Sequence, residues 1–220
     1  MIKFKTKLKD FTIPTSWSDI KCSDLNFFQD ATESEIIEKL TGLSVGEQSF
    51  IDLNEIAPYL EFLQENPFEL IEKTDFYLDI KLPEDIGEHS FEKKIQACAN
   101  LDNPTKLVSV YSGVDEEFIL NDNVDSVYGA YLYLLDRVND IVERDNNALE
   151  SSTTEEQKRA GIEMFNQLGD FNTIDLIARD YNYTHSEIEQ LPYNLIFLIL
   201  FRMNISSKFE KNYSEIIKEK

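Results

Sequence analysis

The feature that most constrains the fold is a long stretch with helical periodicity just past the middle of the chain. In residues 124–144 apolar side chains recur every three or four positions, as in a helix that buries one face. The inner side is formed by Val127, Tyr131, Leu134, Leu135, Val138 and either Ile141 or Val142. The sequence therefore predicts one long helix here, followed by a polar loop over residues 145–154.

Further helices are predicted on both sides of this stretch. Thr32 or Ser34 caps a helix that ends near Gly42, and Thr184 or Ser186 caps the last helical region, because Ser and Thr side chains accept hydrogen bonds from the first turn. Pro58 lies inside one predicted helix, where a kink or a break is expected. The predicted helices are residues 23–31, 33–43, 47–64, 90–100, 155–169, 171–182 and a region that runs to 220 with possible breaks near Pro192 and Asn204.

Three segments are expected to be strands. Residues 2–8 and 76–82 alternate apolar and polar side chains, and residues 106–111 (KLVSVY) are rich in β-branched and aromatic residues, which are signals of strands. We expect one small antiparallel sheet from them. The fold class is then α+β and predominantly α-helical, with a mixed region over residues 1–120 and a helical bundle over 121–220. No Gly/Ser/Pro linker separates these parts, so a single domain overall remains open.

The net charge of −21, from 42 acidic and 21 basic residues among 220, limits the partners. A field of that sign repels phosphate backbones and anionic lipid, so we expect neither nucleic acid nor membrane as a partner. The apolar run YNLIFLILF at 193–201 is far shorter than the roughly 20 residues that span a bilayer. The charge serves solubility alone, or it provides an acidic face for a basic partner or allows crowded self-association.

No pattern of catalytic or metal-ligating residues stands out. His89 and His185 lack a second ligand at metal spacing, and Cys22 and Cys98 form no CxxC motif, so we expect exposed histidines and buried free thiols. The phosphate-binding motifs and the GxSxG elbow are absent, and the acidic run at 115–125 does not match an EF-hand. The weak alternatives are a Cys98 pair with either histidine and a site of carboxylates that lie far apart in the sequence. We therefore expect no enzyme, no cofactor and no metal.

What remains is a capacity for protein contacts. Tyr133 turns away from the inner stripe of its helix, and apolar side chains in residues 193–201 cover much of the helix circumference. A helix that is apolar on several sides must be covered on several sides, by this chain or by another subunit. The candidate interface residues are Tyr133, Tyr193, Phe197 and Phe201. Trp17, the one tryptophan, is expected to be a buried packing anchor.

Three sets of segments carry a family resemblance: residues 13–28 with 35–44, residues 158–178, and residues 191–203 with 208–217. In this order they resemble small tail-region proteins of large tailed bacteriophages, such as tail assembly chaperones and small tail, neck or baseplate proteins. The resemblance implies a structural or assembly role at the tail, neck or portal, with other virion proteins as partners, in the virion or in the host cytoplasm during assembly. A cytoplasmic adaptor or regulator unrelated to phage is the alternative.

Overall fold

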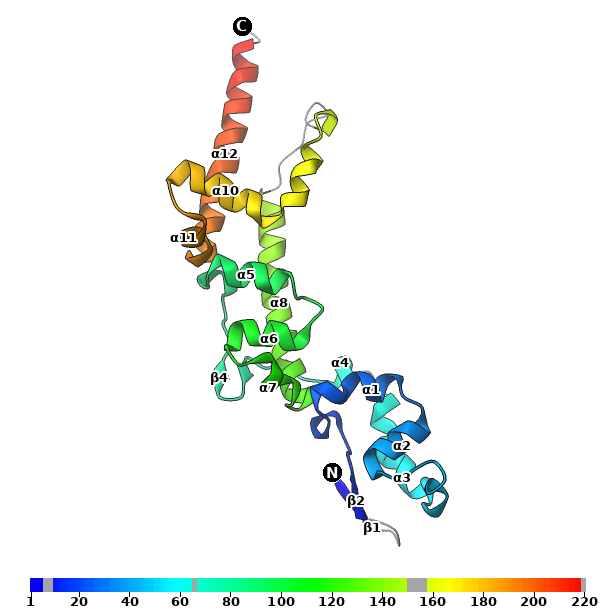
Figure 1. Cartoon of the computed structure of the whole chain (residues 1–220). Helices are drawn as coiled ribbons and strands as arrows, with labels where there is room; N and C mark the ends of the chain where they lie inside the picture. The colour runs from blue at the N-terminus through cyan, green and yellow to red at the C-terminus, as the bar shows by residue number, and fades with distance from the viewer. Residues whose placement is uncertain (6–9, 65–66, 150–157, 219–220) are drawn as a thin grey trace. The chain divides into compact units, whose positions relative to one another are not determined.

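The computed structural model describes residues 1–5, 10–64, 67–149 and 158–218, and the chain packs as two compact units (Figure 1). Unit 1 comprises Met1–Leu82 and Asp102–Leu134, and unit 2 comprises Pro83–Leu101 and Leu135–Lys220. The fold is α+β and predominantly helical, as predicted. The grouping differs from the predicted division at residue 120, because residues 83–101 pack with the C-terminal helices and residues 102–134 pack with the N-terminal part.

Unit 1 begins with two paired strands, the first of which covers residues 2–5 of the strand predicted over residues 2–8, and residues 6–9 lie outside the described part. β1 (Ile2–Lys5) pairs antiparallel with β2 (Asp10–Ile13), so that Phe4 lies opposite Phe11. Phe11 and Ile13 are buried against Ile56 of a nearby helix. Their burial fixes the register, since a shift by one residue would turn every core side chain of the strand outward.

The helices that follow the hairpin begin and end at the predicted signals. Thr32 and Glu35 form a capping box at the start of α2, and Gly42 ends that helix with a φ of 67°. Trp17 is buried, at 4% exposure, as expected of a packing anchor. The predicted helix over 47–64 is divided into three pieces, and Pro58 lies within the middle one. The elements are η1 (Trp17–Asp19), η2 (Cys22–Asp24), α1 (Leu25–Asp30), α2 (Glu33–Thr41), η3 (Gln48–Phe50), α3 (Leu53–Leu60), η4 (Glu61–Gln64) and α4 (Pro67–Leu70).

Two of the strand predictions need correction. The segment 76–82 is a minimal hairpin, β3 (Phe76–Tyr77) and β4 (Ile80–Lys81), that turns at Leu78 with a φ of 52°. The segment 106–111 is part of helix α6 (Pro104–Ser112). Asn103 caps α6 and Pro104 occupies its first turn, which are helix-start signals that outweigh the β-branched composition. The described residues thus contain two separate two-stranded sheets instead of one.

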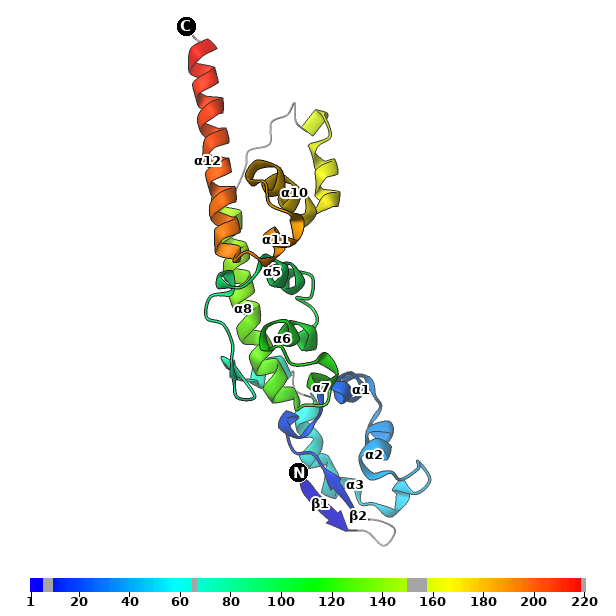
Figure 2. The same cartoon turned by 60° about the vertical axis from the view of Figure 1, so that its left-hand side comes forward.

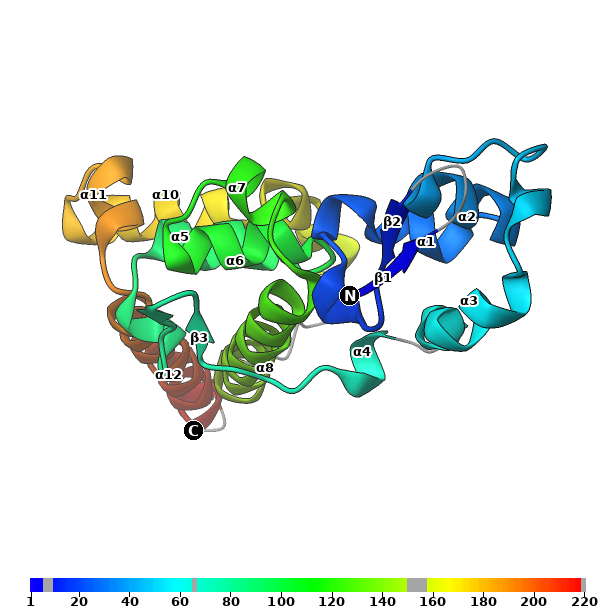
Figure 3. The same ribbon diagram turned by 90° about the horizontal axis from the view of Figure 1, so that it is seen from below.

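The long helix α8 (Val124–Leu149) is confirmed and exceeds its predicted length, because residues 145–149 are helical rather than part of a loop. A short helix, α7 (Glu116–Leu120), occupies part of the predicted acidic loop and is capped by Asp115. α6, α7 and the first turns of α8 lie together in unit 1, as Figure 3 shows from below. The inner side chains Val127 and Leu134 are fully buried there.

Unit 2 is built from helices around the second part of α8 (Figure 2). Thr184 and Glu187 form the capping box of α11, and the chain is extended at Leu191 before the last helix begins. That helix, α12, shows no break at Asn204, contrary to the prediction, and residues 162–168 form a 3₁₀ helix. Residues 150–157, which include the second half of the predicted polar loop, lie outside the described part. The elements are η5 (Ile86–Glu88), α5 (Phe91–Cys98), η6 (Ile162–Leu168), α10 (Asp170–Tyr181), α11 (His185–Gln190) and α12 (Tyr193–Lys218).

Candidate interaction surface on the C-terminal helix

A network of polar contacts fixes the start of α12 within unit 2. The Tyr193 hydroxyl donates a hydrogen bond to the Asp145 carboxylate. Arg144 donates to the side-chain oxygen of Asn194 at 2.8 Å, and the Asn194 amide donates to Asp85 at 2.8 Å. Because the partners come from α8 and from the segment before η5, α12 is tied to two other parts of its unit.

Aromatic packing reinforces the same region. The ring of Phe91 on α5 stacks on Tyr193 at 5.5 Å, and the Arg144 guanidinium lies 4.0 Å from the centre of the Phe197 ring. Ile196 and Ile199 are buried beside them. Burial and the hydrogen bond to Asp145 both raise the pKa of Tyr193, so its hydroxyl stays a donor at neutral pH. One side of the first three turns of α12, with Tyr193, Ile196 and Ile199, therefore belongs to the core of unit 2.

The rest of α12 has no such cover among the described residues. Every residue from 205 to 218 is exposed, although the segment contains five large apolar or aromatic side chains. Phe209 is 66% exposed, and its ring stacks on Tyr213, one turn further on, at 5.9 Å. Figure 2 shows the last turns of α12 extending beyond the other elements of unit 2.

The exposed apolar side chains of α12 fall on one side of the helix. Leu198, Phe201, Ile205 and Phe209 follow one another at intervals of three or four residues, which places them in one row. We call this row with its neighbours the C-terminal apolar face. Its members are Leu195, Leu198, Phe201, Ile205, Phe209, Tyr213, Ile216 and Ile217, all of them exposed.

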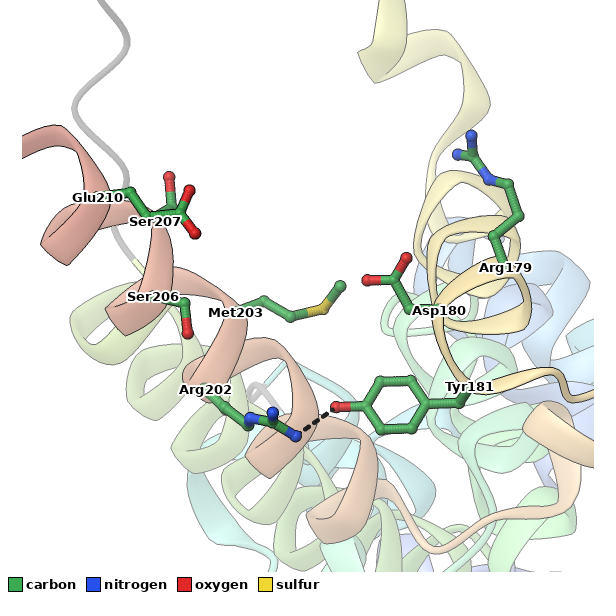
Figure 4. Close-up of a pocket in the computed structure, with 8 residues that line it drawn as sticks. All are labelled: Arg179, Asp180, Tyr181, Arg202, Met203, Ser206, Ser207 and Glu210. Atoms are coloured by element: carbon green, nitrogen blue, oxygen red, sulfur yellow. Dashed lines mark hydrogen bonds between the residues drawn. The ribbon is translucent and has the colours of Figure 1, made fainter. Parts of the chain in front are cut away.

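A cleft of about 670 Å³ lies between α10 and α12 (Figure 4). Arg202 of α12 donates a hydrogen bond to the Tyr181 hydroxyl at 3.3 Å across it, and Arg179 pairs with Asp175 at 2.9 Å on the α10 side. The lining residues are Arg179, Asp180, Tyr181, Arg202, Met203, Ser206, Ser207 and Glu210. They carry charges of both signs and include neither a cysteine nor a histidine.

The four candidate interface residues lie in different environments. Phe201 is exposed and belongs to the C-terminal apolar face, whereas Tyr133 and Phe197 are half-buried. Tyr193 is only 3% exposed and takes part in the network described above. Its side chain thus packs inside unit 2 and is not open to a partner. Sequence reasoning missed Ile205 and Phe209, because the break expected at Asn204 removed them from the helical row whose spacing they continue.

The two thiols are half-buried, and the two imidazoles differ in exposure. Burial, with the nearby Asp122 carboxylate, raises the pKa of Cys22 to about 12, and burial raises that of Cys98. Both thiols are therefore protonated at neutral pH, and the thiol is a much weaker nucleophile than the thiolate. His185 is exposed as predicted, but His89 is half-buried, and burial lowers its pKa.

The described part of the chain holds no group of three or more His, Cys, Asp or Glu side chains arranged to bind a metal ion. Nor do its helices include one with the length and apolar character needed to cross a bilayer. No protein-family model, no curated protein and no solved structure matches this chain.

Proposed function

We propose that this protein is a non-enzymatic subunit or assembly factor of a multi-subunit complex, and that the C-terminal apolar face is its main docking surface. The observation that carries the proposal is the exposure of all eight members of that face. Contiguous exposed apolar surface of this extent is uncommon on proteins that act alone and marks sites of protein contact. An amphipathic helix that docks its apolar row on another protein is a common mode of recognition.

Helix energetics support the same proposal. Each of the 14 residues 205–218 is exposed, and a helical segment of about this length is marginal in water when its apolar face is not packed. Most helical stability in proteins comes from packing of an apolar face. A partner that covers Ile205, Phe209 and Tyr213 would supply that packing.

The resemblance to small tail-region proteins of tailed bacteriophages suggests the setting of this complex. We propose a place at the tail, neck or portal region, in the particle itself or in the host cytoplasm during assembly. The strong negative charge of −21 suits a subunit that must stay dispersed at high concentration until it docks, because like charges repel unassembled copies.

The test compares two variants of the full chain that add the same charge to α12. Phe209→Glu places a carboxylate on the apolar face, and Ser214→Glu places one about 140° away around the helix. Protein analysis of purified particles and of complexes drawn from the producing cell follows the unmodified chain and both variants. We expect the chain and the Ser214→Glu variant in particles or assembly intermediates, and loss of the Phe209→Glu variant.

The outcomes separate the possible roles. Presence in finished particles assigns a virion component, and presence only in intermediates assigns an assembly factor. A defined complex in cells without particles would replace the phage setting by the adaptor role and keep the docking surface. Equal incorporation of both variants, or a chain found in no complex at all, would overturn the proposal.

A further inference from the structure

A second apolar surface lies in unit 1, far from α12 in sequence. Helices α1, α2 and α3 and the 3₁₀ turn η4 enclose a groove of about 280 Å³. Its apolar lining comes from Phe28, Ala31, Ile36, Ala57, Leu60 and Leu63. This volume is below the roughly 300–1,000 Å³ of typical small-molecule sites, so the groove suits protruding side chains better than a ligand.

The surroundings of the groove are strongly acidic. The four elements that enclose it carry six acidic residues and a single basic one, Lys39. One acid, Glu33, lines the groove itself, together with Gln29 and Gln64. A partner for this groove therefore needs an apolar row flanked by positive charge, since complementary potentials guide and select association.

The exposed part of α12 has these properties, in contrast to the chain as a whole. Residues 202–218 contain four basic side chains and two acidic ones, a net charge of +2, whereas the full chain carries −21. Arg202 and Lys208 lie within one turn of Ile205, which belongs to the C-terminal apolar face. The segment is thus locally basic and apolar, where the groove is acidic and apolar.

We infer that the groove in unit 1 receives the C-terminal apolar face of a second copy of this chain. The inference rests on the proposed docking role of that face and names its occupant. Ile205 and Phe209 of one copy enter the groove of the next, and Lys208 faces its acidic rim. Because the two surfaces differ, the contact is head-to-tail, and repeated copies build a ring or an open filament.

A symmetric pair of α12 helices is the competing arrangement. It would cover the same apolar row, but it would bring two segments of net charge +2 together and leave the groove empty. The head-to-tail contact joins unlike charges and covers both apolar surfaces, so the structure favours it. The two arrangements predict different results when defective copies are mixed.

The experiment uses two full-length variants, each with one defective surface. Phe209→Glu disables the helix face, and Ala57→Arg fills the groove with a long side chain that repels Lys208. Ser214→Glu and Asn54→Arg are the matched controls, since neither residue belongs to the apolar face or lines the groove. Sedimentation velocity and light scattering give the mass of each species across a concentration series.

We expect the unmodified chain and both controls to associate as concentration rises, and each variant alone to stay monomeric, with a dissociation constant raised about tenfold or more. An equimolar mixture of Phe209→Glu and Ala57→Arg should form a heterodimer that grows no further. The intact groove of the first then holds the intact helix of the second. Raising the salt concentration should weaken this contact, because screening reduces the charge attraction.

Two results would overturn the inference. The first is self-association of Ala57→Arg with no heterodimer in the mixture, which assigns the symmetric helix pair. The second is a monomer at every concentration. Neither result removes the proposed function if the Phe209→Glu variant is still lost from particles or complexes, because the face would then dock on a different protein. Circular dichroism of each variant checks that the fold is intact.

Discussion

Residues 193–204 and residues 205–218 form one continuous helix, α12, but the two halves differ in what surrounds them. In the first half, Ile196 is fully buried and Tyr193 is bonded to Asp145. In the second half, Phe209 and Tyr213 touch each other and stand in solvent. Apolar composition alone therefore does not tell whether a helix builds the core of its own chain or offers a surface to another.

The difference arises from the other elements. α5, α8 and the segment before η5 supply partners to the first half through Phe91, Arg144 and Asp85. Among the described residues, the side of α12 that lines a cleft with α10 is formed by Arg202, Met203, Ser206, Ser207 and Glu210, and every residue after Glu210 is exposed. The first half is thus a fixed base for the second, which presents its row of side chains to a partner.

The largest expected effect contrasts one buried and one exposed apolar residue of α12. Ile196→Ala leaves a cavity in the core of unit 2 and should lower the free energy of unfolding by about 2–5 kcal/mol. Phe209→Ala removes a side chain that is already in water and should change it by no more than about 0.5 kcal/mol. Urea denaturation followed by circular dichroism measures both variants. Equal losses would mean that the two halves do not differ as described.

The second prediction concerns how closely the first half of α12 packs against η5. A Cβ atom at Gly87 would lie 2.1 Å from the side-chain oxygen of Asn194, so Gly87→Ala must displace the residue that joins Arg144 to Asp85. Such overpacking should lower the free energy of unfolding by about 1–3 kcal/mol. Gly46→Ala is the control, because nothing lies within 4 Å of its added Cβ. A thermal melt with no difference between the two variants would contradict the close fit.

An alkaline titration tests the buried hydroxyl of Tyr193. Burial and the bond to Asp145 raise its pKa in the folded state, so the stability it contributes is complete below the ordinary value of about 10 and is lost as pH rises above it. Between about pH 10 and 12, the free energy of unfolding should therefore fall more steeply with pH for the unmodified chain than for the Tyr193→Phe variant. Identical pH curves for the two proteins would show that Tyr193 is not held as a neutral donor.

The smallest effect concerns the capping box that precedes α12. Thr184→Ala removes the cap of α11 and should lower the free energy of unfolding by about 1 kcal/mol at neutral pH. The backbone and hydroxyl bonds from Thr184 lower the pKa of Glu187, so its contribution is present above the ordinary value of about 4.3 and is lost as pH falls through the lowered one. The difference in the free energy of unfolding between the Thr184→Ala variant and the unmodified chain should therefore become smaller as the pH falls from about 6 to about 3. A constant gap would exclude a role for the carboxylate.

Local signals in the sequence predicted much of the fold. Thr32, Gly42 and Thr184 mark helix ends in the sequence and in the structure, because caps depend on backbone groups a few residues away. The wrong strand prediction at residues 106–111 also has a local reason. Asn103 and Pro104 are helix-start signals, but the β-branched residues that follow them favoured a strand. Strand pairing was harder to predict. We expected one sheet, but the described residues form two separate two-stranded sheets, because strand partners are chosen by packing as well as by alternation.

The sequence by itself determined the helical periodicity of α8 and α12, the burial of Trp17 and the excess of negative charge. These follow from residue spacing and from composition, which are properties of the chain before it folds. Only the tertiary structure decided that Tyr193 is covered while Phe209 is not, and that Ala57 lines a groove. Both outcomes depend on which distant elements pack against a helix face, and spacing within that helix carries no information about its neighbours.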